Sequence, residues 1–256
     1  MKLKSNFAII RSVLCSAVLI PLAGQAQDQA VLLNIYNGSY HAATANNFIS
    51  DASLFGYTLG ISPLDSVSGW DAGWNGATTG GTFSGGQTIS LSYSVGGWAE
   101  NLPTPTPTAP EALADEYLYN NHSPSTPCTV SLGNLNLQAN STYTLLVYGW
   151  INGGNENSML QPLNDNAGIV YNNTTATTSG FLAVQFSTTS SYVNSDALDF
   201  AWANQGGQGD GVLNGMAIVP APEPSSLALA LAGGAAVMGL SVYRRKHQTN
   251  LSGRSA

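Results

Sequence analysis

The feature that most constrains this fold is a regular alternation of apolar and hydroxyl side chains. In the segment 87–95 (QTISLSYSV), Ile89, Leu91, Tyr93 and Val95 alternate with Ser90, Ser92 and Ser94. Successive side chains of a β-strand point to opposite faces, so the pattern predicts an antiparallel strand with the four apolar residues buried. The segment 142–148 repeats it, with Tyr143, Leu145 and Val147 expected inward. Similar patterns predict strands at 31–36, 57–61, 129–132, 181–186, 197–203 and 212–219.

Clusters of Gly, Asn and Ser separate these segments, as at Gly80-Gly81 and Gly206-Gly207. Such residues favour turns, so many short strands joined by polar turns predict an all-β domain, a single jelly-roll-like β-sandwich. Asn214-Gly215 is expected to close the last hairpin. Two other segments differ: 111–119 has the pattern of a short helix, and 102–110 (LPTPTPTAP) that of an extended polyproline-like chain.

The charges are segregated along the chain. All 7 Lys and Arg residues lie before residue 12 or after residue 243, whereas all 14 carboxylates lie between Asp28 and Glu223. Binding of phosphates requires Lys and Arg on the folded surface. The distribution therefore excludes a nucleic-acid-binding protein and argues against anionic substrates.

Residues 1–26 have the pattern of a secretory signal peptide. An apolar run at 12–22 follows the basic residues Lys2, Lys4 and Arg11. The small residues Gly24 and Ala26 fit cleavage by signal peptidase after Ala26. We therefore expect an N-terminal signal helix that is removed on export, leaving an ectodomain at 27–219.

The other end of the chain predicts a membrane anchor. Residues 225–243 are uncharged, and a helix rising about 1.5 Å per residue over this length spans roughly the 30 Å hydrocarbon core of a bilayer. Arg244, Arg245 and Lys246 follow directly and are expected to stay cytoplasmic. The sequence thus predicts a C-terminal transmembrane helix at 225–243, a short cytoplasmic tail at 247–256, and a domain outside the inner membrane.

Pro222, Glu223 and Pro224 stand just before that helix. This Pro-Glu-Pro motif, the apolar helix and the basic cluster together resemble the PEP-CTERM sorting tail of Gram-negative bacteria, over residues 220–246. The resemblance implies that an exosortase, a Cys-dependent transpeptidase-like protease, cuts near the motif and releases the protein to the cell surface or extracellular matrix.

The ectodomain is similar to β-sandwich domains often attached to such tails, which resemble galactose-binding-like and carbohydrate-binding folds. The segments that carry this similarity are 115–118, 132–135, 142–145 and 213–219.

A Gly-rich loop, 69–76 (GWDAGWNG), carries the candidate ligand site. Trp70 and Trp74 have the spacing to stack on sugar rings, with Asp71 and Asn75 bonding to sugar hydroxyls. The alternative is that the two indoles plug one end of the sandwich. Exposure decides between these readings, because a glycan-binding module needs both tryptophans on an open face.

Other chemistry-bearing residues favour structural roles. Cys128 is the one cysteine left after export and is expected in the core, and His41 and His122 are too few for a three-His zinc site. The carboxylates Glu100, Glu111, Asp115 and Glu116 are candidates for glycoside cleavage but are more typical of a helix start. Oxygen-rich loops at 152–157, 164–166 and 208–211 are compatible with calcium, although Asn and Asp form such turns without an ion.

The sequence thus predicts an exported, non-enzymatic protein with a structural or adhesive role and no resident cofactor. Its expected partners are signal peptidase, the exosortase, the inner membrane during export, and an extracellular polysaccharide. A carbohydrate-binding module is the alternative, and a glycan-cleaving enzyme is a third hypothesis.

Overall fold

The computed structural model describes residues 29–36, 43–73, 77–99, 113, 116–150, 158–163, 166–205 and 209–221. These residues form an all-β structure with one short helix in the described part. The elements are β1 (Val31–Tyr36), α2 (Ala45–Leu54), β2 (Val67–Asp71), β3 (Thr78–Thr82), β4 (Thr88–Ala99), β5 (Glu116–Asn120), β6 (Cys128–Gly133), β7 (Thr142–Tyr148), β8 (Ser158–Pro162), β9 (Ile169–Tyr171), β10 (Phe181–Thr188), β11 (Leu198–Asn204), β12 (Gly211–Leu213) and β13 (Gly215–Pro220).

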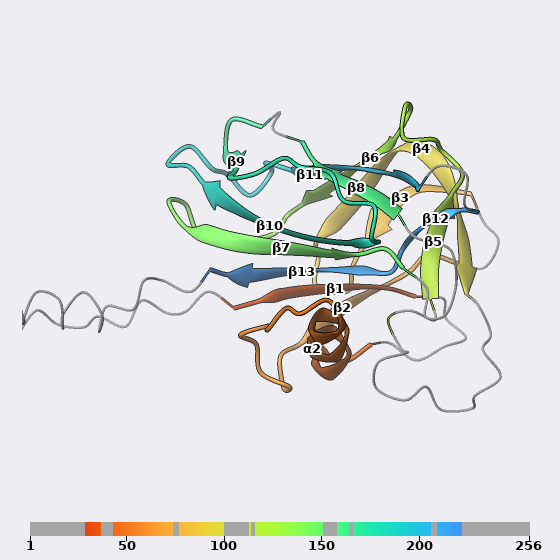
Figure 1. The fold of residues 1–256 in the computed structure, drawn as a ribbon. Coiled ribbons are helices and arrows are strands. Elements are labelled where there is room, and N and C mark those ends of the chain that lie inside the picture. Colours follow the sequence, from red (N-terminus) through yellow and green to blue (C-terminus); the bar gives the residue numbers. More distant parts are fainter. Residues whose placement is uncertain are drawn as a thin grey trace, which may run out of the picture.

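The strands form two sheets that pack face to face (Figure 1). The first sheet has the order β2-β1-β13-β7-β10-β9, and the second has the order β12-β5-β4-β6-β11-β8, with β3 also paired to β4. Strands β1 and β2 run parallel, and the other pairs are antiparallel. Leu145 and Ile218 of the first sheet share a buried core with Val130 and Phe200 of the second. The expected β-sandwich is thus confirmed at the level of an all-β, two-sheet fold.

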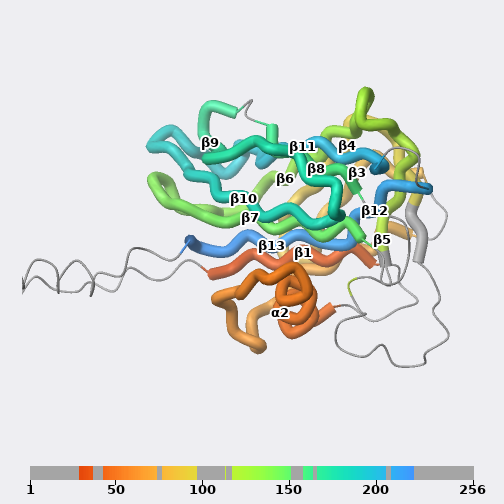
Figure 2. The backbone as a smooth tube through the Cα atoms, viewed as in Figure 1, coloured from red at the N-terminus to blue at the C-terminus, as the bar shows by residue number. Residues whose placement is uncertain are grey.

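Helix α2 adds a third layer on the outer face of the first sheet (Figure 2). Phe48 and Ala52 of the helix are fully buried and pack with Leu32, Leu146 and Ala217 of β1, β7 and β13. These strands are therefore apolar on both faces, which explains why β7 has six consecutive buried residues.

Local interactions define both ends of α2. The side chain of Asn47 accepts a hydrogen bond from the backbone N–H of Thr44 at 2.7 Å, and the helix begins at the next residue. At the other end, Gly56 has a φ of 74°, and Tyr57 N–H bonds back to Ala52 O at 2.9 Å. This left-handed glycine ends the helix in the manner of a Schellman cap.

Asn214 carries the chain from the second sheet to the first. Strand β12 before it pairs with β5, whereas β13 after it pairs with β1 and β7. The expected hairpin at Asn214-Gly215 is therefore wrong: the residue is a crossing point between sheets. Its backbone bonds to Ile35 N–H and Tyr148 O at 3.0 and 2.8 Å, and its side chain accepts from Trp150 N–H at 3.0 Å.

Two further expectations about local structure are wrong. Residues 116–119 of the expected helix form strand β5, because Leu118 faces the core and the strand pairs with both β4 and β12. Residues 57–61 form no strand and instead follow α2 across the first sheet, where Leu59 is buried. The expected extended segment 102–110 lies outside the described residues.

None of the described helices is long and apolar enough to span a membrane. The expected signal peptide at 1–26 and transmembrane helix at 225–243 lie outside the part of the chain that the structure describes.

Candidate functional site

Trp70 lies in β2 and points into the space between the two sheets. Its side chain is only 8% exposed and belongs to the main core cluster. The indole meets the ring of Phe83 at a centroid distance of 6.0 Å and an angle of 69°. A buried indole offers no face to a sugar ring, so the burial of Trp70 favours the alternative interpretation, in which this residue fills the core of the sandwich.

Gly81 in β3 makes the burial of Trp70 possible. A Cβ atom at this glycine would lie 2.2 Å from the Nε1 atom of Trp70, so the indole occupies the space that any larger residue would need. The neighbouring Asp71 is exposed and accepts a hydrogen bond from Gly73 N–H at 3.0 Å. Trp74 and Asn75 lie outside the described residues, and their expected contact with glycan stays a prediction.

The structure exposes an aromatic pair that sequence reasoning missed. Tyr93, expected in the core, is 47% exposed, and its ring stacks on His122 with centroids 4.6 Å apart and an angle of 25°. The two residues come from β4 and from the loop between β5 and β6, and they meet on the surface of the second sheet.

A change of register in β4 turns Tyr93 outward. Strand β3 pairs Gly80 with Ser90 but Thr78 with Val95, so β4 has extra residues between these two positions. The hydroxyl of Ser92 accepts a hydrogen bond from the backbone N–H of Thr129 at 2.8 Å, next to the point where the pairing of β4 with β6 ends at Leu91 and Val130. The alternation predicts the burial of Ile89, Leu91 and Val95 correctly and fails only within this bulge.

The backbone around His122 is fixed by hydrogen bonds to asparagine residues. His122 N–H donates to Asn120 Oδ1 at 3.2 Å, and Asn204 N–H donates to His122 O at 2.9 Å. Asn204 Nδ2 also donates to Asn121 O at 3.2 Å. Asn120 is itself buried and donates to Trp202 O at 3.4 Å, so the loop is bonded to the core of the sandwich.

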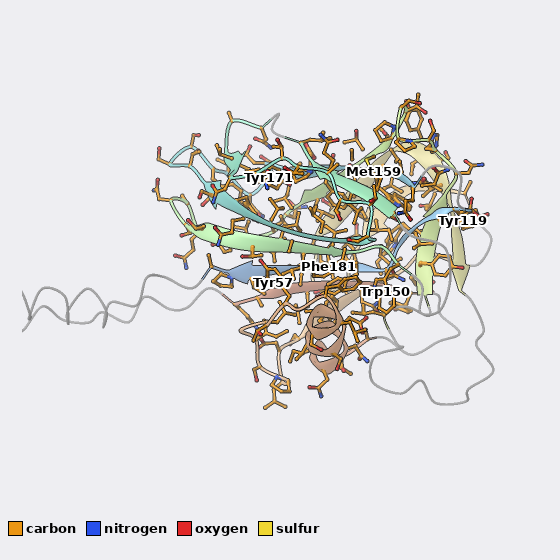
Figure 3. The ribbon with its side chains drawn as sticks, viewed as in Figure 1. Tyr57, Tyr119, Trp150, Met159, Tyr171 and Phe181 are labelled. Carbon is orange, nitrogen blue, oxygen red and sulfur yellow. The ribbon has the colours of Figure 1, made fainter. Side chains whose placement is uncertain are left out.

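A second group of aromatic residues lies at the end of α2 (Figure 3). The rings of Phe55 and Phe181 stack in parallel at 4.4 Å, and Trp150 meets Phe55 edge-on at 5.5 Å. Tyr57 packs against Phe181 at 6.1 Å. The Nε1 atom of Trp150 is buried and has no hydrogen-bond partner among the residues that the structure describes. This group covers the outer face of the first sheet and serves packing between layers.

The other predicted residues contribute less to a site. Cys128 is fully buried, as expected for a core residue. Asn166 bonds to Ala197 O and Gly168 N–H, which is a turn role, and burial raises the pKa of Asp210. Within the described residues, no three His, Cys, Asp or Glu side chains form a group suited to a metal ion.

Several candidates lie outside the described residues or their side chains do. These are Glu100, Glu111, Asp115, the side chain of Glu116, His41, the calcium-compatible segments 152–157 and 164–165, the sorting motif Pro222, Glu223 and Pro224, and the basic anchor Arg244, Arg245 and Lys246. No family model, no curated protein and no solved structure matches the chain.

Proposed function

We propose that this chain is an exported PEP-CTERM protein of a Gram-negative bacterium, processed by signal peptidase and an exosortase. Its proposed place is the cell surface or extracellular matrix, after a membrane-anchored precursor stage, and its role is structural or adhesive rather than enzymatic. The sequence signals at 1–26 and 220–246 support export and sorting, and the end of the folded domain supports the processing step.

The observation that carries the proposal is the position of the last strand. β13 is hydrogen-bonded on one side to β1 and on the other to β7, and the last bond runs from Ala221 N–H to Thr142 O at 2.9 Å. Pro222 is the next residue. A cut at or beyond the Pro-Glu-Pro motif therefore leaves in place every bond that the described residues of this sheet make, as release of a folded protein requires.

The order of strand pairing supports a jelly-roll-like sandwich. β1 pairs with β13, β6 with β11 and β7 with β10, so the pairs are nested from the ends of the chain toward its middle. A jelly roll is a long hairpin rolled into two sheets, which gives nested pairs of this kind. Strand β9 departs from the pattern, because it pairs with β10 in the first sheet.

A carbohydrate-binding module is the second candidate. The burial of Trp70 supports a structural role for that residue, but the exposed pair of Tyr93 and His122 supports contact with a ligand. An adhesive matrix protein and a glycan-binding module are compatible, because adhesion to a matrix requires a surface that contacts the polymer.

Two tail variants test the processing proposal. Replacing Pro222 and Glu223 with Ala should leave insertion intact and block release, so that uncut protein accumulates in the inner membrane. Replacing Arg244, Arg245 and Lys246 with Gln should weaken both topology and processing. If the Pro222/Glu223 variant reaches the medium with the same mass as the unmodified protein, the motif only links the domain to the helix. The processing proposal is then wrong.

A further inference from the structure

We propose that Tyr93 and His122 form the contact surface for an uncharged sugar chain. This inference rests on the carbohydrate-binding alternative given above and names its residues and its ligand class. The proposed site, called here the Tyr93 surface, consists of the Tyr93 and His122 rings and the exposed polar residues Ser94, Asn121 and Ser123 beside them in the chain.

The first argument is that the fold turns Tyr93 away from the core. Its alternation partners Ile89, Leu91 and Val95 are 2%, 7% and 3% exposed, whereas Tyr93 is 47% exposed. A β4 without the bulge would place Tyr93 with those three residues, where its ring would bury apolar surface and stabilise the sandwich. β-Bulges often redirect a side chain at a functional site, and this bulge presents an aromatic ring to solvent.

The second argument is the geometry of the pair. His122 stacks on the Tyr93 ring with centroids 4.6 Å apart, and Tyr93 stays 47% exposed beside it. An aromatic face packs against the C–H groups of a pyranose ring, and the nearby hydroxyl and imidazole groups bond to sugar hydroxyls. Ser94, Asn121 and Ser123 are exposed neighbours of the two rings in the chain, and they bring further donors and acceptors to this part of the surface.

The third argument is that the surface is held in place before any ligand arrives. Three hydrogen bonds fix the loop: one from His122 to Asn120, and two from Asn204 to His122 and Asn121. The bond between Ser92 and Thr129 fixes the bulge. A contact surface that is already ordered loses less conformational entropy on binding.

The charge of the domain restricts the ligand to an uncharged chain. Residues 27–243 contain no Lys or Arg, so no guanidinium or ammonium group of the domain pairs with a uronate or sulfate. The carboxylates of the domain repel polyanions as well. Stacking and hydrogen bonds are the interactions that the Tyr93 surface offers, and an uncharged polysaccharide uses both.

Affinity electrophoresis of the full chain in detergent tests this inference. The probes are dextran, a soluble β-1,3-glucan and galactomannan as neutral polymers, with alginate as the anionic polymer. We expect retardation by at least one neutral polymer and none by alginate. Tyr93→Ala should weaken that binding about tenfold or more, His122→Ala should weaken it less, and Tyr93→Phe should retain it because the ring remains.

Leu64→Ala is the matched control, since Leu64 is 93% exposed and lies outside the Tyr93 surface. It should bind like the unmodified chain. Unchanged circular dichroism of Tyr93→Ala separates loss of the contact from loss of the fold. The inference is overturned if no neutral polymer binds, if alginate is the polymer bound, or if Tyr93→Ala binds normally. Cell fractionation of the same variants reports export separately, so normal release without glycan binding refutes only the Tyr93 surface.

Discussion

The indole Nε1 of Trp202 donates a hydrogen bond of 3.1 Å to the hydroxyl of Ser158, and both side chains are fully buried. The same hydroxyl accepts the backbone N–H of Val212 at 2.8 Å and donates to the carbonyl oxygen of that residue. Ser158 begins β8 and Val212 lies in β12, which stand at opposite ends of the strand order of the second sheet. One side chain thus joins the two ends of this sheet.

Replacing Ser158 with Ala should lower the free energy of unfolding by about 3 kcal/mol or more. The substitution leaves the Trp202 Nε1–H and the Val212 N–H and carbonyl groups buried without this partner, and each orphaned buried polar group costs about 1–3 kcal/mol. Urea denaturation followed by tryptophan fluorescence measures the change. Ser90→Ala, at an exposed position of β4, is the control and should change stability by less than about 0.5 kcal/mol. Equal stability of the two variants would contradict the role given to Ser158.

Replacing Gly81 with Ala should destabilise the domain by about 1–3 kcal/mol, as expected for overpacking in a core. The new methyl group would lie 2.2 Å from Nε1 of Trp70, so the indole or the strand must move. Gly60→Ala is the matched control, because a Cβ atom there has no heavy atom within 4 Å. Thermal unfolding measures the melting temperatures of the two variants. Similar values for Gly81→Ala and Gly60→Ala would contradict tight packing of Trp70 against Gly81.

The domain should lose stability above about pH 10, and Tyr148 should contribute to the loss. Burial, and secondarily the negative charge of Asp51, raise the pKa of Tyr148 in the folded state. In the unfolded chain the phenol ionises near its ordinary value of about 10, so unfolding then releases a proton that the folded state retains. The free energy of unfolding therefore falls with rising pH, by up to about 1.4 kcal/mol per pH unit for this group.

Tyr148→Phe separates this effect from other alkaline effects. The variant loses the bond from the Tyr148 hydroxyl to Phe48 O, 3.2 Å long, and about 1 kcal/mol at neutral pH. Its stability should decline less steeply from pH 9 to about pH 11 than that of the unmodified chain. Identical slopes for the two proteins would show that Tyr148 does not titrate on unfolding.

The released domain should lose solubility as the pH falls from 7 to about 4. With no Lys or Arg between residues 12 and 243, repulsion among carboxylates is the main charge interaction, and protonation removes it. Solubility measured by light scattering across this range checks the expectation. Constant solubility would mean that carboxylate repulsion does not keep the domain in solution.

Residue patterns predict much of the fold where one strand face is buried and the other is not. Ile89, Leu91 and Val95 are buried as the alternation requires, and so are Tyr143 and Val147. In β7 the outer face is buried too, because α2 covers it, and that layer is not encoded in the strand itself. Half of the residues of helix α2 are apolar, and packing of this apolar side against the sheet stabilises it.

The pairing partners of strands depend on distant residues and were not predictable from local patterns. Asn214-Gly215 has the chemistry of a hairpin turn, yet β12 and β13 join different sheets. The bulge that exposes Tyr93 arises from a mismatch between β3 and β4, so the alternation alone predicts burial of that ring. For Trp70, the stacking hypothesis and the core hypothesis differ only in whether the indole is buried. Its burial depends on the space beside Gly81 in β3, which the sequence around Trp70 does not encode.

The mass of the intact protein recovered from the culture medium tests the central claim most directly. The proposed processing predicts a chain that begins at Gln27 and ends near Pro222–Pro224, and therefore lacks the apolar segment at 225–243 and the basic anchor. A covalent modification of the surface would add to the measured mass, but it would not change where the polypeptide begins and ends. Recovery of a chain that retains Arg244, Arg245 and Lys246, or its presence only in the membrane fraction, would contradict release by an exosortase.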